Sequence, residues 1–275
     1  MIQLFPAIKK RMTLFLVVYM ALVFFLGFLG ETSLLALILF SLIGIASIVI
    51  SQYSNANKAH EHLLGKLYNN MDAEGFIRDY EPLLNVDVKH PNLHMMIRLH
   101  LSNAYCALGR FDDAIALLSA IPFPPQKKEE ADLIARYTVF SNMCYCALLA
   151  KDLPAAERYM NETEGYKKRL DAIQETKPKM QRMAFSNLLN EQCLRLLKTG
   201  KCDPVILRDK VQVNNTQMLH RVTTGLWIAR ALIAEGNRRD AKVILERIDK
   251  VAGHLFVGQE ARALLSGIPT KEESK

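Results

Sequence analysis

Residues Leu101–Leu118 read LSNAYCALGRFDDAIALL, and their pattern predicts two short helices joined by a tight turn. Gly109 is expected to end the first helix, because glycine tolerates the left-handed backbone found at helix C-termini. Asp112 and Asp113 fall in the first turn of the second helix, where carboxylates offset the positive end of the helix dipole. Before the turn, apolar residues recur at the spacing of a buried helix face, at Leu101, Ala104, Tyr105 and Leu108.

The same turn recurs elsewhere in the chain. The residues at the turn are, in chain order, Gly109, Lys151, Gly200 and Gly236. Successive members of this set are 42, 49 and 36 residues apart. A fifth, weaker copy lies at Asn70–Tyr80. Five residues after the turn, three copies have alanine and the remaining one has valine, at Ala114, Ala156, Ala241 and Val205. A small residue at this point is expected where the two helices of a hairpin cross closely.

Leu101–Leu118 resembles the tetratricopeptide repeat (TPR) family. The family pattern has Leu, a small residue, Ala-Tyr, Leu-Gly, an aromatic residue and Ala at these offsets. The resemblance extends, more weakly, over most of Asn55–Gly267. It implies a TPR-like α-solenoid of helix-turn-helix repeats that binds a protein or peptide partner on its concave face. The copies are spaced more widely than the family period of about 34 residues, so insertions are expected. A generic bundle of antiparallel helices is the alternative.

Two apolar runs precede the repeats, at Met12–Gly30 and Leu34–Ile50. Between Met12 and Ile50 the only charged residue is Glu31. A helix needs about 17–25 apolar residues to cross a bilayer, so the runs predict a transmembrane helical hairpin. A cleaved signal peptide is the alternative, but no convincing cleavage site follows the first run before the second begins.

The orientation of this hairpin follows from Lys9, Lys10 and Arg11, because basic residues that flank a span tend to stay in the cytoplasm. The prediction is a multi-pass protein of the cell membrane with its repeat domain in the cytoplasm. An odd count of five cysteines, irregularly spaced, suits a reducing compartment. The expected all-α organisation is a basic cytoplasmic N-terminus (1–11), two transmembrane helices (12–50, at about 12–30 and 34–50), a repeat domain (51–267) and a flexible tail (268–275).

The sequence contains no phosphate-binding glycine loop, zinc-protease helix or serine-nucleophile elbow. Cys144 and Cys146 are two apart and point in different directions on a helix, which favours ordinary core or groove cysteines over a metal site. His90 and His94 could share a helix face but have no third ligand nearby, which favours a surface location. The expectation is a protein that is not an enzyme, with no catalytic, cofactor-binding or metal-binding residue.

Projection of the repeat pattern onto the concave face gives the candidate partner-binding residues Leu99, Asn103, Asn142, Tyr145, Asn190 and Arg230. Members of the family that grip a peptide carboxylate use Lys, Asn and Arg on these helices. Here Asn103 and Asn142 match the two asparagines, but Leu99 stands at the expected lysine. The resemblance therefore implies an incomplete carboxylate clamp.

Charge is distributed unevenly along the chain. Ser51–Glu164 contains 11 Lys/Arg and 15 Asp/Glu, whereas Gly165–Arg262 contains 19 and 10. Candidate residues for a basic patch are Lys167, Lys168, Arg169, Arg238 and Arg239. The favoured function is a membrane-anchored scaffold or adaptor for a protein or peptide. Contact of the basic half with anionic lipid or nucleic acid is the alternative. Nucleic acid is disfavoured, because no aromatic platform accompanies the basic residues.

Overall fold

The computed structural model describes residues 1–30, 33–86, 91–123, 129–173, 177–203, 205–207 and 217–268, with the backbone alone for 177–186. The regular elements of these residues are all helices, and the described residues contain no β-strand. The helices are η1 (Ile2–Leu4), α1 (Pro6–Phe28), α2 (Leu34–Tyr68), α3 (Ala73–Tyr80), η2 (Glu81–Asn85), α4 (Pro91–Ala107), α5 (Phe111–Ser119), α6 (Glu129–Ala150), α7 (Leu153–Asp171), α8 (Lys177–Thr199), α10 (Met218–Ala234), α11 (Arg238–Ala252) and α12 (Phe256–Ser266).

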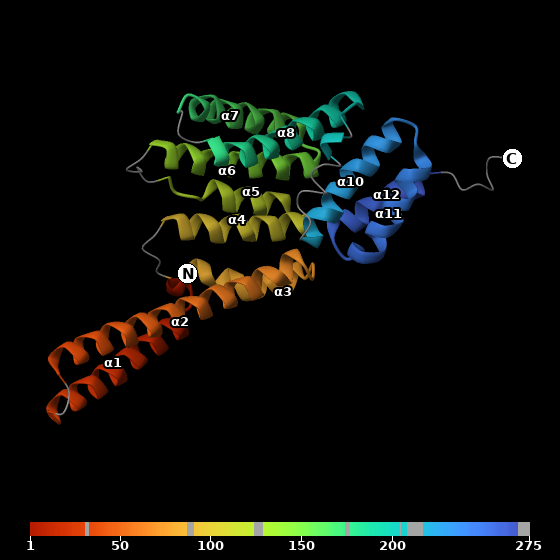
Figure 1. Cartoon of the computed structure of the whole chain (residues 1–275). Helices are drawn as coiled ribbons and strands as arrows, with labels where there is room; N and C mark the ends of the chain where they lie inside the picture. Colours follow the sequence, from red (N-terminus) through yellow and green to blue (C-terminus); the bar gives the residue numbers. More distant parts are fainter. Residues whose placement is uncertain are drawn as a thin grey trace.

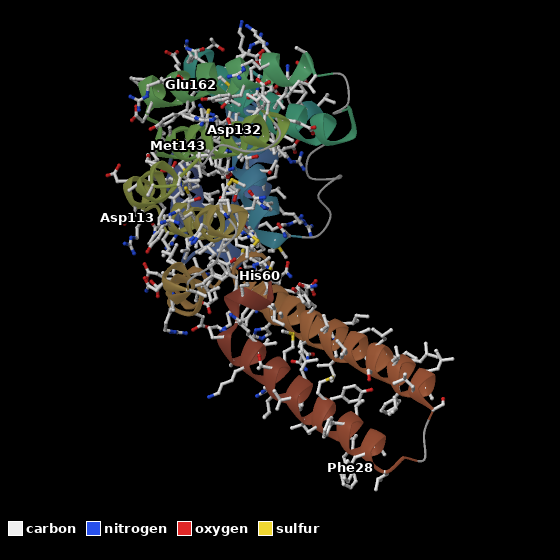
Figure 2. All side chains as sticks on the ribbon, turned by 90° about the vertical axis from the view of Figure 1, so that its left-hand side faces the viewer. Phe28, His60, Asp113, Asp132, Met143 and Glu162 are labelled. Atoms are coloured by element: carbon white, nitrogen blue, oxygen red, sulfur yellow. The ribbon has the colours of Figure 1, made fainter. Side chains whose placement is uncertain are left out.

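Helices α1 and α2 form a hairpin that projects away from the rest of the molecule (Figure 1). Figure 2 shows Phe28 at the far tip of this hairpin and His60 where it joins the other helices. The hairpin is closely packed at Gly44, where a Cβ atom would lie 2.0 Å from the Tyr19 ring. The Tyr19 hydroxyl also donates to the Phe40 carbonyl at 2.6 Å. Small residues thus let the two helices approach, as in membrane helix pairs.

The outer surface of the hairpin is apolar, with Phe24 78% and Phe28 84% exposed. Both α1 and α2 are long and apolar enough to cross a membrane. Helix α6 also meets these criteria, but 61% of its apolar window is buried among other helices, which is typical of a core helix. Helix α1 begins at Pro6, before the predicted span, because proline suits the first position of a helix and Lys9–Arg11 continue it.

Helix α2 continues without a break for 35 residues, from the apolar hairpin to the helices that follow it. At 1.5 Å per residue it is about 52 Å long. Its last turns pack against α3 and against η1 at the N-terminus, where Leu4 is fully buried. The absence of proline between Ile50 and Asn70 agrees with this continuity. The apolar hairpin and the remaining helices are therefore joined by a helix.

The helices from α3 to α12 form what we call the helical body. Helices α4 to α8 lie side by side, each packed on the next (Figure 1). A separate group, α10 to α12, lies beside them, and we call it the C-terminal block. Most buried side chains of the body belong to one continuous core, which includes Trp227, Phe76 and Leu148, all fully buried.

The predicted turns share one backbone conformation. Among the described residues, positive φ angles occur at Gly30 in the apolar hairpin and at the five repeat turns, with Met71 at 57°, Gly109 at 76°, Lys151 at 61°, Gly200 at 68° and Gly236 at 81°. After α4, the Gly109 amide donates to the Cys106 carbonyl and the Arg110 amide donates to the Tyr105 carbonyl. The same pair of bonds follows α6 and α10, so three helices end in the same Schellman motif.

The alanines five residues beyond these turns are also equivalent. Ala114, Ala156 and Ala241 are all fully buried. The copy with valine differs, because Val205 is 57% exposed. Three helical hairpins, α4–α5, α6–α7 and α10–α11, therefore have the same turn and the same close contact.

The C-terminal block folds back onto the beginning of the helical body. The rings of Tyr68 and His220 stack with centroids 5.3 Å apart, which joins α2 to α10. His254 Nε2 lies 2.9 Å from the Met71 carbonyl oxygen, 183 residues earlier in the chain. Helix α12 packs against α11, α10 and α4.

Candidate functional site

A polar cavity of about 170 Å³ lies where helices α4, α6, α8 and α10 meet. We call it the amide cavity, because three asparagines contribute to its wall. Its described lining consists of Asn103, Ser141, Asn142, Tyr145, Leu189, Asn190, His220 and Thr224. Four of the six predicted partner-binding residues thus surround one space: Asn103, Asn142, Tyr145 and Asn190.

Asn103 is held at one side of the cavity by a chain of hydrogen bonds. Its Nδ2 donates to the Tyr68 hydroxyl at 2.9 Å, and that hydroxyl lies 2.8 Å from His100 Nδ1. The ring of His220, another lining residue, stacks on Tyr68. This side of the cavity is therefore fixed by contacts between α2, α4 and α10.

The other two asparagines are held within the body in different ways. Asn142 Nδ2 donates to the Thr138 carbonyl one turn earlier in α6, at 2.7 Å. Asn190 is 4% exposed, and its Nδ2 donates to the carbonyl and hydroxyl oxygens of Ser141, at 3.0 and 3.2 Å. Asn190 thus joins α8 to α6. Asn142 makes its hydrogen bond within its own helix, so of the three asparagines it contributes least to the contacts between helices.

The described lining of the amide cavity has no Lys, Arg, Asp or Glu. His100, the histidine in the chain of hydrogen bonds that holds Asn103, is uncharged at neutral pH. Burial, with the nearby His60 and His220, lowers its pKa to about 4. A carboxylate placed in this cavity would lose hydration without meeting a cation, which is costly. The lining instead suits an uncharged hydrogen-bonding group, and the volume is below the roughly 300–1,000 Å³ of drug-sized sites.

Arg230, the predicted groove residue of α10, lies elsewhere. Its guanidinium is 2.5 Å from the Glu260 carboxylate of α12 and stacks over the Trp227 ring at 4.6 Å. Lys151 approaches the same carboxylate at 2.8 Å. Partial burial opposes ionisation of Glu260, but the hydrogen bonds from Lys151 and Arg230 lower its carboxyl pKa overall. Arg230 therefore joins helices within the C-terminal block.

On α10 the predicted residue and the cavity lining lie on different faces of the helix. His220 and Thr224 are the residues of this helix that line the cavity, whereas the sequence projection selected Arg230. Thr224 and Arg230 are six residues apart, which rotates the side chain by about 240° around the helix. The four-residue spacing of His220 and Thr224 was a signal that could have indicated the face of α10 that lines the cavity. Leu99, the remaining predicted groove residue, is half-buried against the main core and is outside the described cavity lining.

The predicted basic residues fall into two separate groups. Lys167, Lys168 and Arg169 are near the end of α7, on the left in Figure 1, and Arg238 and Arg239 begin α11, on the right. In the first group, Arg169 pairs with Glu129 at 2.8 Å and Lys167 with Asp171 at 3.8 Å. The structure thus does not bring the two groups together.

Cys144 and Cys146, the two cysteines of the sequence Cys-Tyr-Cys, are both buried. Cys144 is fully buried and Cys146 is 1% exposed. The described residues contain no group of three or more His, Cys, Asp or Glu side chains placed to hold a metal ion. His94 is half-buried, and His90 lies outside the described residues. Comparison with known proteins returns no match, since no family model, curated protein or solved structure matches this chain.

Proposed function

We propose that this protein is a membrane-anchored scaffold that holds a peptide or protein partner at the amide cavity. In this proposal α1 and α2 span the cell membrane, with the helical body in the cytoplasm. The hairpins α4–α5, α6–α7 and α10–α11, together with α8, form a TPR-like solenoid. The shared turns at Gly109, Lys151 and Gly236, and the buried alanines that follow them, support this assignment.

One observation carries the binding proposal. Asn103 of α4, Asn142 of α6 and Asn190 of α8 come from three different helices and line the same cavity. A binding surface on stacked hairpins is built in this way, with each repeat contributing one helix to a shared concave side. Because the described lining has no Lys, Arg, Asp or Glu, the group inserted by the partner is an uncharged polar side chain or a backbone amide. A terminal carboxylate is disfavoured.

Photocrosslinking in the native cells tests this proposal. A photoreactive benzoylphenylalanine replaces Asn142 in one full-length variant and the exposed Lys168 in a matched control. We expect illumination to give a discrete protein adduct from position 142 and none from position 168. Unlabelled Asn142→Leu protein should also retain less of the crosslinked partner on purification, whereas Lys168→Leu should retain the normal amount.

Two results would contradict the proposal. An adduct from position 168 with none from 142 would shift binding from the cavity to the basic residues of α7. Salt-sensitive binding of the full-length protein to anionic vesicles, with no protein adduct at either position, would favour a lipid-binding function.

A further inference from the structure

A second surface on the helical body is apolar rather than polar. Helices α10 and α11 leave a groove of about 320 Å³ between them, which we call the α10–α11 groove. It is lined by Met218, Arg221, Val222, Gly225, Ile228, Val243, Ile244, Arg247, Ile248 and Val251. None of these residues lines the amide cavity.

The groove has two of the few large apolar side chains that the described body exposes. Beyond the apolar hairpin, which ends at Ile50, the exposed large hydrophobic residues are Tyr53, Val205, Val243 and Val251. Two of these four, Val243 at 54% and Val251 at 37%, belong to the groove. Its floor is buried, with Val222, Ile228 and Ile248 less than 9% exposed. The surface is thus a lined depression rather than scattered apolar residues.

Gly225 keeps the groove open. A Cβ atom at this position would lie 3.3 Å from Ile248 Cδ1 and 3.7 Å from Ile244 Cγ2. A larger residue would therefore fill the space between the two helices. Val243, Arg247 and Val251 are four residues apart and form one stripe along α11. This stripe is about 12 Å long, which matches roughly two turns of another helix.

The rim of the groove is positively charged. Arg221 and Arg247 are both exposed, and neither forms an ion pair with a described residue. The carboxylates of α11 are already engaged, because Glu246 lies near Lys242, Asp249 pairs with Arg262 and Asp240 contacts Asn237. An occupant must therefore supply its own carboxylates to neutralise the two arginines.

We propose that the α10–α11 groove docks an amphipathic helix of a partner protein, with apolar residues facing the groove and Asp or Glu beside them. A helix already packs against this same pair, because α12 contacts both α10 and α11 without contributing to the groove lining. The α10–α11 pair thus offers a second surface on which a helix can pack. Helix-in-groove recognition of this type uses apolar anchors at helical spacing.

The full-length protein in nanodiscs can be titrated with synthetic helical peptides of about 14 residues, a length of nearly four helical turns. One fluorescent probe has leucines at helical spacing flanked by glutamates, and a second has the same leucines flanked by lysines. We expect the acidic probe to bind at least about tenfold more tightly, since each tenfold difference is only about 1.4 kcal/mol.

Matched variants locate the site. Val243→Ser with Val251→Ser should weaken binding of the acidic probe by about tenfold or more, because apolar contact area is lost. Val205→Ser, which changes an equally exposed valine outside the groove, should leave it unchanged. Arg221→Glu with Arg247→Glu should reverse the preference, so that the lysine probe binds better. Arg238→Glu with Arg239→Glu should preserve the original preference.

The reversal is a gain of binding that an unfolded variant would not show. Equal binding of the two probes, or no binding of either, would overturn the proposal. So would a concentration-dependent dimer that Val243→Ser and Val251→Ser dissociate, because the groove would then join two copies of this chain. Since these residues lie outside the amide cavity, failure here leaves the crosslinking result at Asn142 to be judged separately.

Discussion

The Sγ atoms of Cys106 on α4 and Cys146 on α6 lie 2.6 Å apart. Both residues are buried, at 4% and 1% exposed. Burial, together with the hydrogen bond between Cys106 and Cys146, raises the pKa of the Cys106 thiol well above its usual range. The Cys106 thiol is therefore neutral at this contact between two neighbouring hairpins, and thiolate chemistry at Cys106 is suppressed.

Alkylation of the folded protein should begin at Cys202. This cysteine is half-buried, whereas Cys106, Cys144, Cys146 and Cys193 are buried. Reaction requires both access and the thiolate form, so the buried residues should react only after unfolding. Peptide mass mapping after timed iodoacetamide treatment measures the order. Modification of Cys106 as fast as Cys202 in the folded protein would contradict the packing of α4 against α6.

Replacement of Ala114 by leucine should destabilise the helical body. Ala114 is fully buried in α5, and a larger side chain there would overpack the contact with α4, at a cost of about 1–3 kcal/mol. The matched control is Ala116→Leu on the same helix, because Ala116 is exposed. Thermal unfolding followed by circular dichroism gives the comparison. If the two variants melt alike, the close crossing at Ala114 is wrong.

Mild acid should weaken the junction between α2, α4 and the C-terminal block through His100. Its pKa is about 4 in the folded protein and 6.5 when exposed, so the unfolded chain binds the proton first as pH falls. The contribution of neutral His100 to the free energy of unfolding is fully present above about pH 6.5. It falls by on the order of 3 kcal/mol between there and about pH 4.

His100→Gln should therefore show a smaller loss of melting temperature between pH 7 and pH 5 (roughly the range in which the unfolded histidine becomes protonated). His62→Gln, at an exposed histidine, serves as the control. Thermal melts of the full-length protein in detergent, measured across this range, test the expectation. An unchanged pH dependence in His100→Gln would show that other groups dominate.

The proposed topology predicts that the link between α1 and α2 faces outward while the helical body faces the cytoplasm. A Glu31→Cys variant in intact cells should react with a membrane-impermeant maleimide. An Asn57→Cys variant, whose exposed position lies in α2 beyond Ile50, should react only after the cells are opened. The reverse pattern would place the helical body outside. Each variant is also labelled in opened cells as a control, because both positions must react there for the comparison to be valid.

The local features of the fold were predictable from the sequence. Glycine at 109, 200 and 236 and the residue pattern around Lys151 indicated the turns, because a helix end that needs positive φ restricts the residue types that fit. The two apolar helices followed in the same way from length and composition. These inferences concern residues that are close in the chain.

The contacts that close the molecule were not predictable in this way. Arg230 pairs with Glu260, and His220 stacks on Tyr68, only because the C-terminal block folds back onto α2 and α4. Nothing in a helical period specifies which distant helix will be met. Asn103, Asn142 and Asn190 were found because the helical projection placed all three on the concave face, whereas His220 and Thr224 required the rotation of α10 to be known.

The unbroken run of α2 from Leu34 to Tyr68 has a consequence for how partners are encountered. Eighteen residues separate Ile50 from Tyr68, the last residue of α2, which places the end of this helix about 27 Å beyond the apolar segment when measured along the helix axis. A flexible tether would let the body search a broad volume near the membrane. If α1 and α2 span the membrane as proposed, a stiff helix would instead hold the body at one distance from the bilayer, and a partner bound to the body would meet only targets at that distance.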